Sequence, residues 1–401
     1  MRHFHIIFAT LLTSALLFSC VRVGDGNPYM PDLQRLEISL EVPDGDSADY
    51  SLAEISVRDI NTDATYPARC DASGKAVVDV PNGVYMVTVS ILNGEQSFNG
   101  TRSGVVVSGA SSDCAIKLSR LRLSDIVIKE IYCGGCLKYP QEGTYQSDSY
   151  IILHNNSAST VHLDGLCFGT LDPYNSNSVS VWEEGIDFSP IIQAVWQFPG
   201  GGEDFPLGKG EDAIIAVRGA IDHSAYYPQS VNLNREDVFV CYNPLYFANP
   251  IYHPAPGPLV RTDHYMNVVI KTGQSNAYTL SINSPAVVIF RAEGTTIQEF
   301  VSKSENVIQK PGSDKDRIVC IPNEWVLDGV EVFNGGSSSN KKRISPSIDA
   351  SYVTLSKTFE GRSLMRRTDE NMSAKKGYEV LVDTNNSSKD FYERETQSLH
   401  K

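Results

Sequence analysis

Apolar and polar residues alternate in short runs through the first third of the chain. The alternation is regular in residues 36–42 and 53–57, and it returns in residues 77–80 and 85–89 on either side of the turn Pro81-Asn82-Gly83. Successive side chains of a β-strand point to opposite faces, so a period of two broken by frequent turns is typical of antiparallel β-sandwiches. We therefore expect residues 33–119 to form a β-sandwich.

The remainder of the chain, residues 124–401, contains similar strand-like runs broken by Gly and Pro. The candidate strands are residues 126–130, 150–155, 161–165, 213–217, 231–242, 286–291 and 318–332. These short runs with turn signals between them predict a second, larger sandwich. The predicted fold class is therefore all-β, with a smaller sandwich followed by a larger one.

Two stretches interrupt the larger predicted sandwich, at about residues 172–204 and 243–263. Both are rich in aromatic residues, and prolines stiffen the second. Loops on a rigid scaffold often carry binding residues, although the first stretch could equally cover the end of the sandwich. The candidate ligand-binding residues in and beside these stretches are Trp182, Trp196, Tyr246, Tyr252, His253 and His264.

The first 20 residues are patterned differently from the rest. A basic start and an apolar run from Ile6 to Phe18 are typical of a secretion signal, and the run is too short to span a bilayer. Leu17-Phe18-Ser19-Cys20 resembles the lipobox of bacterial lipoproteins, in which cleavage leaves the cysteine as a lipid-modified N-terminus. We expect Cys20 to hold the protein on a membrane through its acyl chains, with residues 21–32 as a flexible tether. The alternative is an ordinary signal peptide with an incidental cysteine.

Composition narrows the class of partner. The 401 residues carry a formal net charge of −14 and show no clustered basic face. A nucleic-acid surface needs Lys and Arg to neutralise phosphates, so we expect no nucleic-acid partner. The hydrophobic content of 41% is sufficient for a buried core.

Several segments resemble known modules. Residues 74–89, with a Gly-initiated strand, a Pro-x-Gly turn and Tyr-x-Val-x-Val, resemble carboxypeptidase-regulatory-like or prealbumin-like sandwiches, which are mostly spacers and adhesion units. Residues 126–130, 150–155 and 161–165 resemble the lamin-tail domain, an immunoglobulin-like sandwich, and residues 361–391 resemble its closing segment. One departure is Ser149, at a position where that domain usually has Glu.

Taken in order, these segments resemble an uncharacterised lipoprotein family from Bacteroides and relatives, similar in length to this chain. The resemblance implies an exported, lipid-anchored protein of the outer membrane or cell surface. By analogy with other surface lipoproteins of such bacteria, it implies that the protein acts beside an outer-membrane TonB-dependent receptor. A glycan is the other partner expected. The resemblance implies architecture and location, and no particular biochemical activity.

Cysteines offer candidate disulfides. Of the 8 cysteines, Cys70 and Cys114 fall in the first predicted sandwich, and in an exported protein we expect them to pair. Cys133-Gly134-Gly135-Cys136 has the spacing of a redox or metal pair, but it follows a strand and not a helix N-terminus. A disulfide involving Cys133 or Cys136, free thiols, or a metal site completed by other cysteines all remain open.

Motifs for catalysis are missing from the sequence. It contains no His-Glu-x-x-His and no Gly-x-Ser-x-Gly, and its glycine-rich turns precede strands and lack phosphate-binding geometry. We expect no catalytic residues, no metal site and no cofactor. A weak alternative is calcium bound by loop residues, namely Asp222, Asp237, Asp263, Asp383 and Asn385.

The sequence thus favours a membrane-anchored, non-enzymatic protein that binds a ligand or partner. A cell-surface hydrolase with dispersed Asp and His residues is one alternative, and a purely structural or adhesion protein is another.

Overall fold

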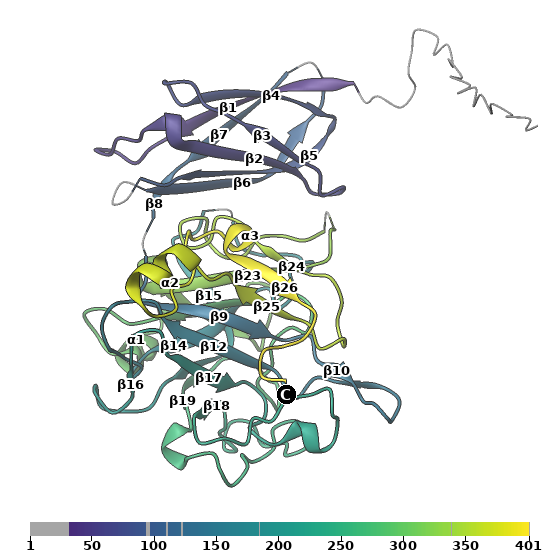
Figure 1. Ribbon diagram of the computed structural model, residues 1–401, viewed down its shortest axis with the longest axis vertical. Helices are drawn as coiled ribbons and strands as arrows, with labels where there is room; N and C mark the ends of the chain where they lie inside the picture. Colours follow the sequence, from purple (N-terminus) through teal and green to yellow (C-terminus); the bar gives the residue numbers. More distant parts are fainter. Residues whose placement is uncertain are drawn as a thin grey trace, which may run out of the picture.

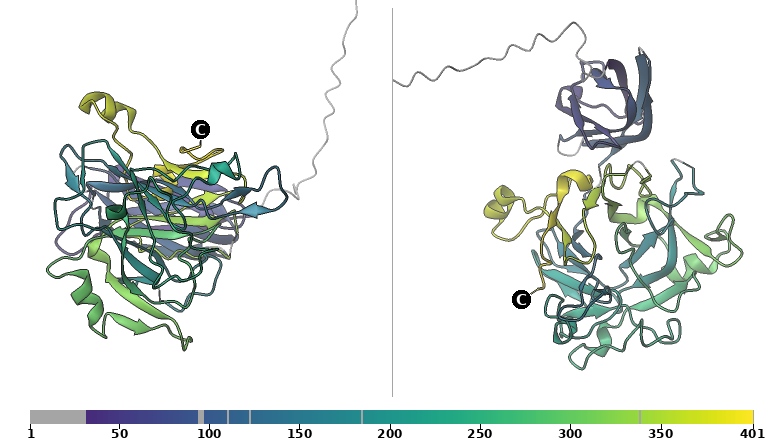
Figure 2. Two further views of the ribbon diagram at one scale, coloured as in Figure 1. Left: turned by 90° about the horizontal axis from the view of Figure 1, so that it is seen from below. Right: turned by 90° about the vertical axis from the view of Figure 1, so that its right-hand side faces the viewer.

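The computed structural model describes residues 32–93, 97–109, 111–121, 123–183, 185–337 and 339–400. The predicted signal segment, Cys20 and nearly all of the predicted tether lie outside these residues. Within them, strands dominate and no helix is long and apolar enough to cross a membrane. Figures 1 and 2 show a smaller β-sandwich stacked on a larger one along the long axis of the molecule.

In the smaller sandwich, one sheet has the order β4-β1-β7 and the other has the order β3-β2-β5-β6-β8. Strand β1 pairs antiparallel with β4 and parallel with β7. The strands are β1 (Leu33–Glu41), β2 (Ala53–Asp59), β3 (Thr65–Ala68), β4 (Lys75–Pro81), β5 (Gly83–Ile91), β6 (Phe98–Val107), β7 (Ser111–Lys117) and β8 (Ser119–Arg120).

The core of the smaller sandwich follows from the alternation in the sequence. On β1 every second residue is buried, namely Leu36, Ile38 and Leu40. These side chains join a cluster with Val57, Val87 and other apolar residues, all between residues 36 and 118. Burial of this face contributes roughly 25 cal/mol for each Å² of apolar surface removed from water, which explains why the period of two persists in the sequence.

The larger sandwich packs a sheet of order β18-β17-β12-β9-β25-β26 against a sheet of order β21-β22-β15-β14-β20-β23-β24, to which β19 adds beside β15. The strands of the first sheet are β9 (Ile126–Tyr132), β12 (Tyr150–Asn155), β17 (Asp212–Ala216), β18 (Val238–Val240), β25 (Ser363–Arg366) and β26 (Phe391–Arg394). Those of the second are β14 (Cys167–Leu171), β15 (Phe188–Gln197), β19 (Asn267–Lys271), β20 (Ala286–Phe290), β21 (Val307–Gln309), β22 (Arg317–Pro322), β23 (Val326–Asn334) and β24 (Val353–Leu355).

Short elements complete the larger sandwich. Two-residue strands pair as β10 (Cys136–Leu137) with β11 (Thr144–Tyr145), and as β13 (Val161–His162) with β16 (Pro206–Leu207). The α-helices are α1 (Ile297–Ser302), α2 (Glu370–Lys376) and α3 (Ser387–Asp390). Helix α1 begins with a capping box in which Thr296 and Glu299 satisfy each other's backbone N–H groups.

Strands β9, β12 and β14 are buried on both faces, so they read as apolar runs without alternation. A bulge in β9 shifts its register against β12, because Ile152 lies opposite Glu130 while Leu153 lies opposite Ile128. Lys129 is the extra residue at this bulge. Bulges re-aim side chains, and here the result is that Lys129 points to a polar cluster on the outside of the sheet.

The two sandwiches contact each other directly. The Asn99 amide donates to the carbonyl of Thr384 at 2.6 Å, and Lys389 forms an ion pair with Glu54 at 2.6 Å. Met86 of the smaller sandwich packs with Phe333 and Tyr352 of the larger one in a small buried cluster. These contacts bring β5 and β6 against the end of the larger sandwich (Figure 2, right).

The predicted all-β class is confirmed. Strands β1, β2, β4 and β5 cover the alternating runs, and β12 matches residues 150–155. Residues 231–242, however, form a strand only in β18, and the rest of that run is turns. Residues 318–332 divide into β22 and β23 around a turn of 3₁₀ helix at Asn323–Trp325.

Candidate functional site

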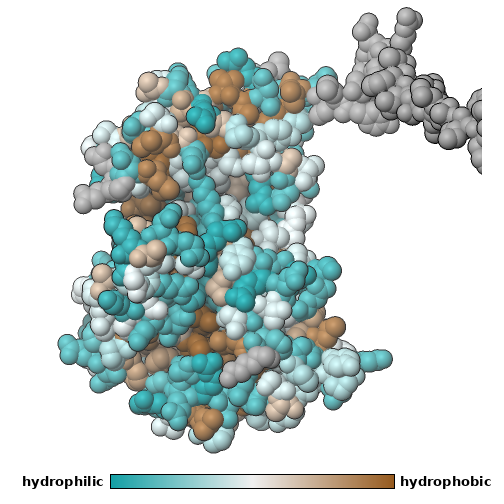
Figure 3. All heavy atoms as spheres, viewed as in Figure 1, coloured by the Kyte–Doolittle hydropathy of each residue, from teal (hydrophilic) through white to brown (hydrophobic). Residues whose placement is uncertain are grey.

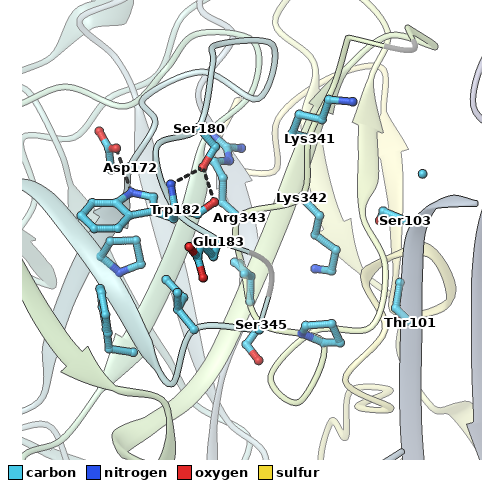
Figure 4. Close-up of a pocket in the computed structure, with 17 residues that line it drawn as sticks. Thr101, Ser103, Asp172, Ser180, Trp182, Glu183, Lys341, Lys342, Arg343 and Ser345 are labelled. Atoms are coloured by element: carbon cyan, nitrogen blue, oxygen red, sulfur yellow. Dashed lines mark hydrogen bonds between the residues drawn. The ribbon is translucent and has the colours of Figure 1, made fainter. Parts of the chain in front are cut away.

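A cleft of about 290 Å³ lies where the smaller sandwich meets the larger one (Figure 4). Residues of β6 form one wall, a segment before β15 forms the opposite wall, and residues 341–346 close the back. The mixture of aromatic, basic and hydroxyl side chains is typical of small-molecule sites, which are mostly apolar with a few convergent polar groups.

Trp182 on the far wall is held in one orientation. Its indole Nε1–H donates to Oδ2 of buried Asp172 at 3.0 Å, and its ring lies edge-on to Phe188 with centroids 5.7 Å apart. The other Asp172 oxygen accepts from Nζ of Lys310 at 2.6 Å. A tryptophan fixed in this way offers a rigid apolar surface at little entropic cost on binding.

The back of the cleft is positioned by a buried ion pair. The guanidinium of Arg343 contacts Oε1 of Glu331 with both Nε (2.8 Å) and Nη2 (2.7 Å). The other oxygen, Oε2, accepts from the backbone N–H groups of Arg343 and Ile344. Because the Glu331 carboxylate binds both the side chain and the backbone of this segment, residues 341–346 have a defined conformation although they belong to no strand.

Lys342 is the unusual group of the cleft. Only 6% of its side chain is exposed, yet its Nζ has no hydrogen-bond partner among the described residues. The nearest carboxylate, Asp349, is 3.9 Å away. Asp349 is itself saturated by the N–H groups of Glu331, Ser351 and Ser387 and by the Ser387 hydroxyl.

Burial raises the pKa of Asp349, and the Lys342 ammonium opposes that rise. In Figure 4, Lys342 extends into the space between Ser345 and Thr101, whereas Lys341 points away from it. A buried ammonium that has one carboxylate at 3.9 Å and no hydrogen bond is costly to desolvate, which sets Lys342 apart from the other charged groups of the cleft.

The smaller sandwich supplies Thr101 and Ser103 to the cleft. The Thr101 hydroxyl donates to the carbonyl of Ala350 and so ties the wall of the cleft to the larger sandwich. The site is therefore shared between both sandwiches, and neither alone encloses it.

Among the predicted ligand-binding residues, the structure separates Trp182 from Trp196. Trp182, from the predicted insertion at 172–204, lines the cleft, and its ligand-binding role stays a prediction. Trp196 is fully buried on β15, stacked on Phe247 and edge-on to Tyr278. The role expected of Trp196 is thus corrected, because its ring is a fully buried core side chain.

The loop at 243–263 lies at the end of the larger sandwich away from the smaller one (Figure 1). Tyr246 and Tyr252 are exposed, together with Leu245 and Ile251. Much of the rest of the surface is hydrophilic on the face shown in Figure 3. His253 is buried, so that the same loop presents two tyrosines and hides its histidine.

The two predicted histidines are packing residues. His253 stacks on Tyr242, and its Nε2 accepts from the N–H of Asn243 at 3.1 Å. His264 is also buried and stacks on Phe239 with ring centroids 4.2 Å apart. Burial, followed by the nearby charge of Arg218, lowers the pKa of His253 to about 4. Neither ring reaches the cleft, which corrects their expected role.

The structure does not join Cys70 to Cys114. Cys70 bridges to Ala76 on β4, Ala76 pairs with Ile38 on β1, and Ile38 pairs with Cys114 on β7. Adjacent strands are about 4.8 Å apart, so two intervening strands separate these cysteines by far more than the roughly 7 Å limit for a disulfide. The sheet register therefore shows that the predicted Cys70–Cys114 disulfide is wrong.

Cys133 and Cys136 are both thiols in the structure. Cys133 is fully buried, and burial raises its pKa to about 12. Burial and the neighbouring Asp148 carboxylate raise the pKa of Cys136 to about 12. These directions are opposite to those of a reactive redox pair, for which a thiolate must be favoured.

A second polar cluster lies on the outer face of the β9 sheet. His154, Asp212 and Glu379 bring potential metal ligands within 4.8 Å of one another, and they form the one such group among the residues described. However, Nζ of Lys129 already contacts both carboxylates, at 2.7 and 2.6 Å. Both His154 ring nitrogens are also engaged, by Asp212 and by the carbonyl of Glu379.

The Lys129 ammonium therefore occupies the position that a divalent cation would need. The sequence did not reveal this cluster, because Glu379 is far from β9 in the chain. The one signal was Lys129, which stands with Glu130 among the apolar residues of β9. The aspartates considered as calcium ligands do not join this group. Asp237, Asp263 and Asp383 pair instead with arginines, and Asp222 caps a turn of 3₁₀ helix.

The fold and site define an all-β protein of two stacked sandwiches with a cleft at their junction. Residues 209–398 match the model of a family described as a protein of unknown function (DUF4876). A solved crystal structure of a DUF4876 family protein from Bacteroides thetaiotaomicron is 26% identical with a TM-score of 0.58. The match covers 90% of this chain and 94% of that one. The predicted relationship to a Bacteroides family is confirmed in this coarse form.

A solved structure of a DUF3823 family protein from Parabacteroides merdae is more remote, at 7% identity with a TM-score of 0.18, covering 35% of this chain and 67% of that one. No curated protein matches the chain. The prealbumin-like and lamin-tail-like resemblances of the two sandwiches stay predictions.

Proposed function

We propose that this protein is a lipid-anchored, non-enzymatic binding protein whose ligand occupies the cleft between the two sandwiches. The observation that carries the proposal is Lys342, a buried ammonium without a hydrogen-bond partner among the described residues, lining the same cleft as the fixed ring of Trp182. A ligand with an anionic group and a flat apolar face satisfies both. A sugar acid is the simplest molecule of that chemistry.

The arrangement favours binding over hydrolysis. Asp172 in the cleft is held by Trp182 and Lys310, and Glu331 behind it is held by Arg343. This leaves exposed Glu183 as the one lining carboxylate outside such contacts among the described residues. Glycoside hydrolysis generally uses a pair of carboxyl groups, and a single carboxyl does not make that pair. The half-open cleft also suits a ligand that protrudes, such as the end of a glycan chain.

Binding is tested with sodium glucuronate as the probe and glucose as its neutral counterpart, by calorimetry and tryptophan fluorescence. Glucuronate should bind and glucose should bind at least about tenfold more weakly, because a charged hydrogen bond contributes roughly 1.5–3 kcal/mol. Lys342→Met should abolish the preference, and Trp182→Ala should weaken the binding of both sugars. Lys357→Met, on an exposed lysine paired with Glu360, is the matched control and should bind like the unchanged protein.

Equal weak binding of glucuronate to all four proteins would overturn the assignment of the cleft.

Anchoring by lipid at Cys20 is tested separately. Labelling with palmitate should mark the protein, and Cys20→Ala should move it from the membrane to the soluble fraction. Unchanged fractionation of that variant would contradict the lipid anchor. Purification of the anchored protein with its bound partners then tests for an outer-membrane receptor.

A further inference from the structure

A second, smaller cavity of about 60 Å³ lies inside the larger sandwich, near the ends of β9 and β17 and the start of β12. Its polar lining comes from Arg218, Gln146, Ser149, Tyr174 and Thr279. One water needs roughly 10–15 Å³ of such space, so this cavity can hold a group of several heavy atoms. Gln146 is exposed and forms its rim.

Arg218 is the charged group of this cavity, and it is only 7% exposed. Its Nε donates to the carbonyl of Tyr252 at 3.0 Å, and the Tyr252 ring lies 5.4 Å from the guanidinium carbon. No ion pair to Arg218 exists among the residues that the structure describes. The Nε contact leaves the two Nη groups as the ends of a planar fork, the geometry that binds a carboxylate with two parallel hydrogen bonds.

The rest of the polar lining consists of hydrogen-bond donors. Ser149 contributes a hydroxyl and Gln146 an amide. Tyr174 and Thr279 share one hydrogen bond of 2.9 Å between their hydroxyls, so one of these hydroxyl protons is left for another acceptor. Among the described residues that line the cavity none is acidic. A donor-rich cavity around a cation is complementary to an anion.

The buried charge of Arg218 affects the pKa values of Arg218 itself and of His253. Burial lowers the pKa of Arg218 because the charged form loses hydration, while tyrosines and the more distant Asp148 oppose this. The same positive charge contributes to the lowered pKa of His253.

We infer that the Arg218 cavity is a binding site for a small carboxylate, distinct from the cleft at Lys342. The two Nη groups of Arg218 bind the carboxylate oxygens, and the Ser149 hydroxyl donates a further hydrogen bond. Tyr252, from the loop at 243–263, positions the guanidinium through its carbonyl. The carboxylate belongs either to a free small acid or to a longer molecule, the rest of which extends out of the cavity beside Gln146.

The test is calorimetric titration of the whole protein with sodium formate, sodium acetate, N-acetylglycine and sodium chloride at constant ionic strength. Formate or acetate should bind. Arg218→Met keeps the length of the side chain and should weaken that binding by at least about tenfold. Ser149→Ala retains the charge and should weaken it less. Arg235→Gln, on an arginine paired with Asp237 at the surface, should bind as the unchanged protein does.

Ser149→Asp supplies the carboxylate from within the protein, so it should abolish binding and raise the thermal midpoint relative to Ser149→Ala. This arm remains informative if Arg218→Met does not fold. Tight binding of N-acetylglycine would identify the longer molecule as the source, and its exclusion would identify a free acid. Binding of chloride alone, or formate binding that survives both Arg218→Met and Ser149→Asp, would overturn the inference.

Discussion

Two buried cations of the larger sandwich, Arg366 and Lys342, differ in how completely the protein neutralises them. The Arg366 guanidinium contacts Asp328 at 2.5 Å, Asp383 at 3.2 Å and Asp390 at 3.5 Å, and its Nε donates to the carbonyl of Ile128. Lys342, almost equally buried, has one carboxylate at 3.9 Å and no hydrogen bond.

This difference distinguishes a cation that the protein neutralises from one that the proposed ligand would pair. Arg366 on β25 joins β9, β23 and helix α3, so its partners come from segments far apart in the chain. Lys342 joins nothing of comparable strength, although its neighbour Arg343 is fully paired with Glu331. We expect substitutions at the two sites to differ accordingly, with stability changed at Arg366 and ligand binding changed at Lys342.

The largest effect should come from Arg366→Met. Removing the guanidinium leaves three buried carboxylates without a counter-charge, and breaking a buried pair in this way costs about 3–5 kcal/mol of unfolding free energy. Urea unfolding measures it. Arg367→Met, on the exposed neighbour beside Tyr392, is the control and should change stability by no more than about 0.5 kcal/mol. Equal losses in the two variants would contradict the structural role of Arg366.

The carboxylate excess around Arg366 should appear in the pH dependence of stability. Burial raises the pKa of Asp328 to about 7 and that of Asp390 to about 6, against the attraction of Arg366. A raised carboxyl pKa in the folded state means that the unfolded state releases its proton first, so stability falls as pH rises through the folded pKa.

Between pH 6 and pH 8 we therefore expect the unchanged protein to lose about 1 kcal/mol relative to Asp328→Asn. Buried histidines with lowered pKa values, such as His253, act in the opposite direction but chiefly below their ordinary pKa of about 6.5. Urea unfolding of both proteins at several pH values gives the difference. A difference that does not change with pH would show that Asp328 stays ionised throughout.

The sequence predicted strands far better than contacts between distant residues. Alternation at Leu36, Ile38 and Leu40 encodes a strand locally, and the structure confirms it. The Cys70–Cys114 pair failed because the register of β4, β1 and β7 depends on nonlocal pairing that spacing does not encode.

The candidate site was predicted only in part, for a similar reason. Trp182 and Trp196 both lie in one aromatic-rich insertion, yet one lines the cleft and the other fills the core. The difference arises because Trp196 is on β15, a strand that lies within the range 172–204 that we had assigned to an insertion. Nothing in the sequence indicated a special role for Lys342, because its burial depends on contacts with the smaller sandwich and on the Arg343–Glu331 pair.

A smaller loss of stability is expected at the Lys129 cluster. Lys129 lies between Arg366 and Lys342 in how completely the protein neutralises the cation. Glu379→Gln removes one of two carboxylates from Lys129 but leaves Asp212 in place, and Glu379 is partly exposed. Exposed ion pairs contribute about 0.2–1 kcal/mol, so we expect a loss of about 0.5 kcal/mol in urea unfolding. Asp212→Asn should cost more, because Asp212 also accepts from buried His154. The reverse order would mean that Glu379 is the main partner of Lys129.

The smallest effect on stability should come from Lys342→Met. Replacing a buried, poorly paired charge by an apolar chain of similar length is often neutral, because the desolvation cost disappears with the charge. Asp349 keeps its four donors from the backbone and Ser387, so it is not left unsatisfied. We expect a change of less than about 1 kcal/mol in urea unfolding, in either direction. A loss close to that of Arg366→Met would show that the Asp349 contact is structural and that the ammonium needs no ligand. Neutral stability together with lost glucuronate binding is the combination that separates a binding residue from a structural one.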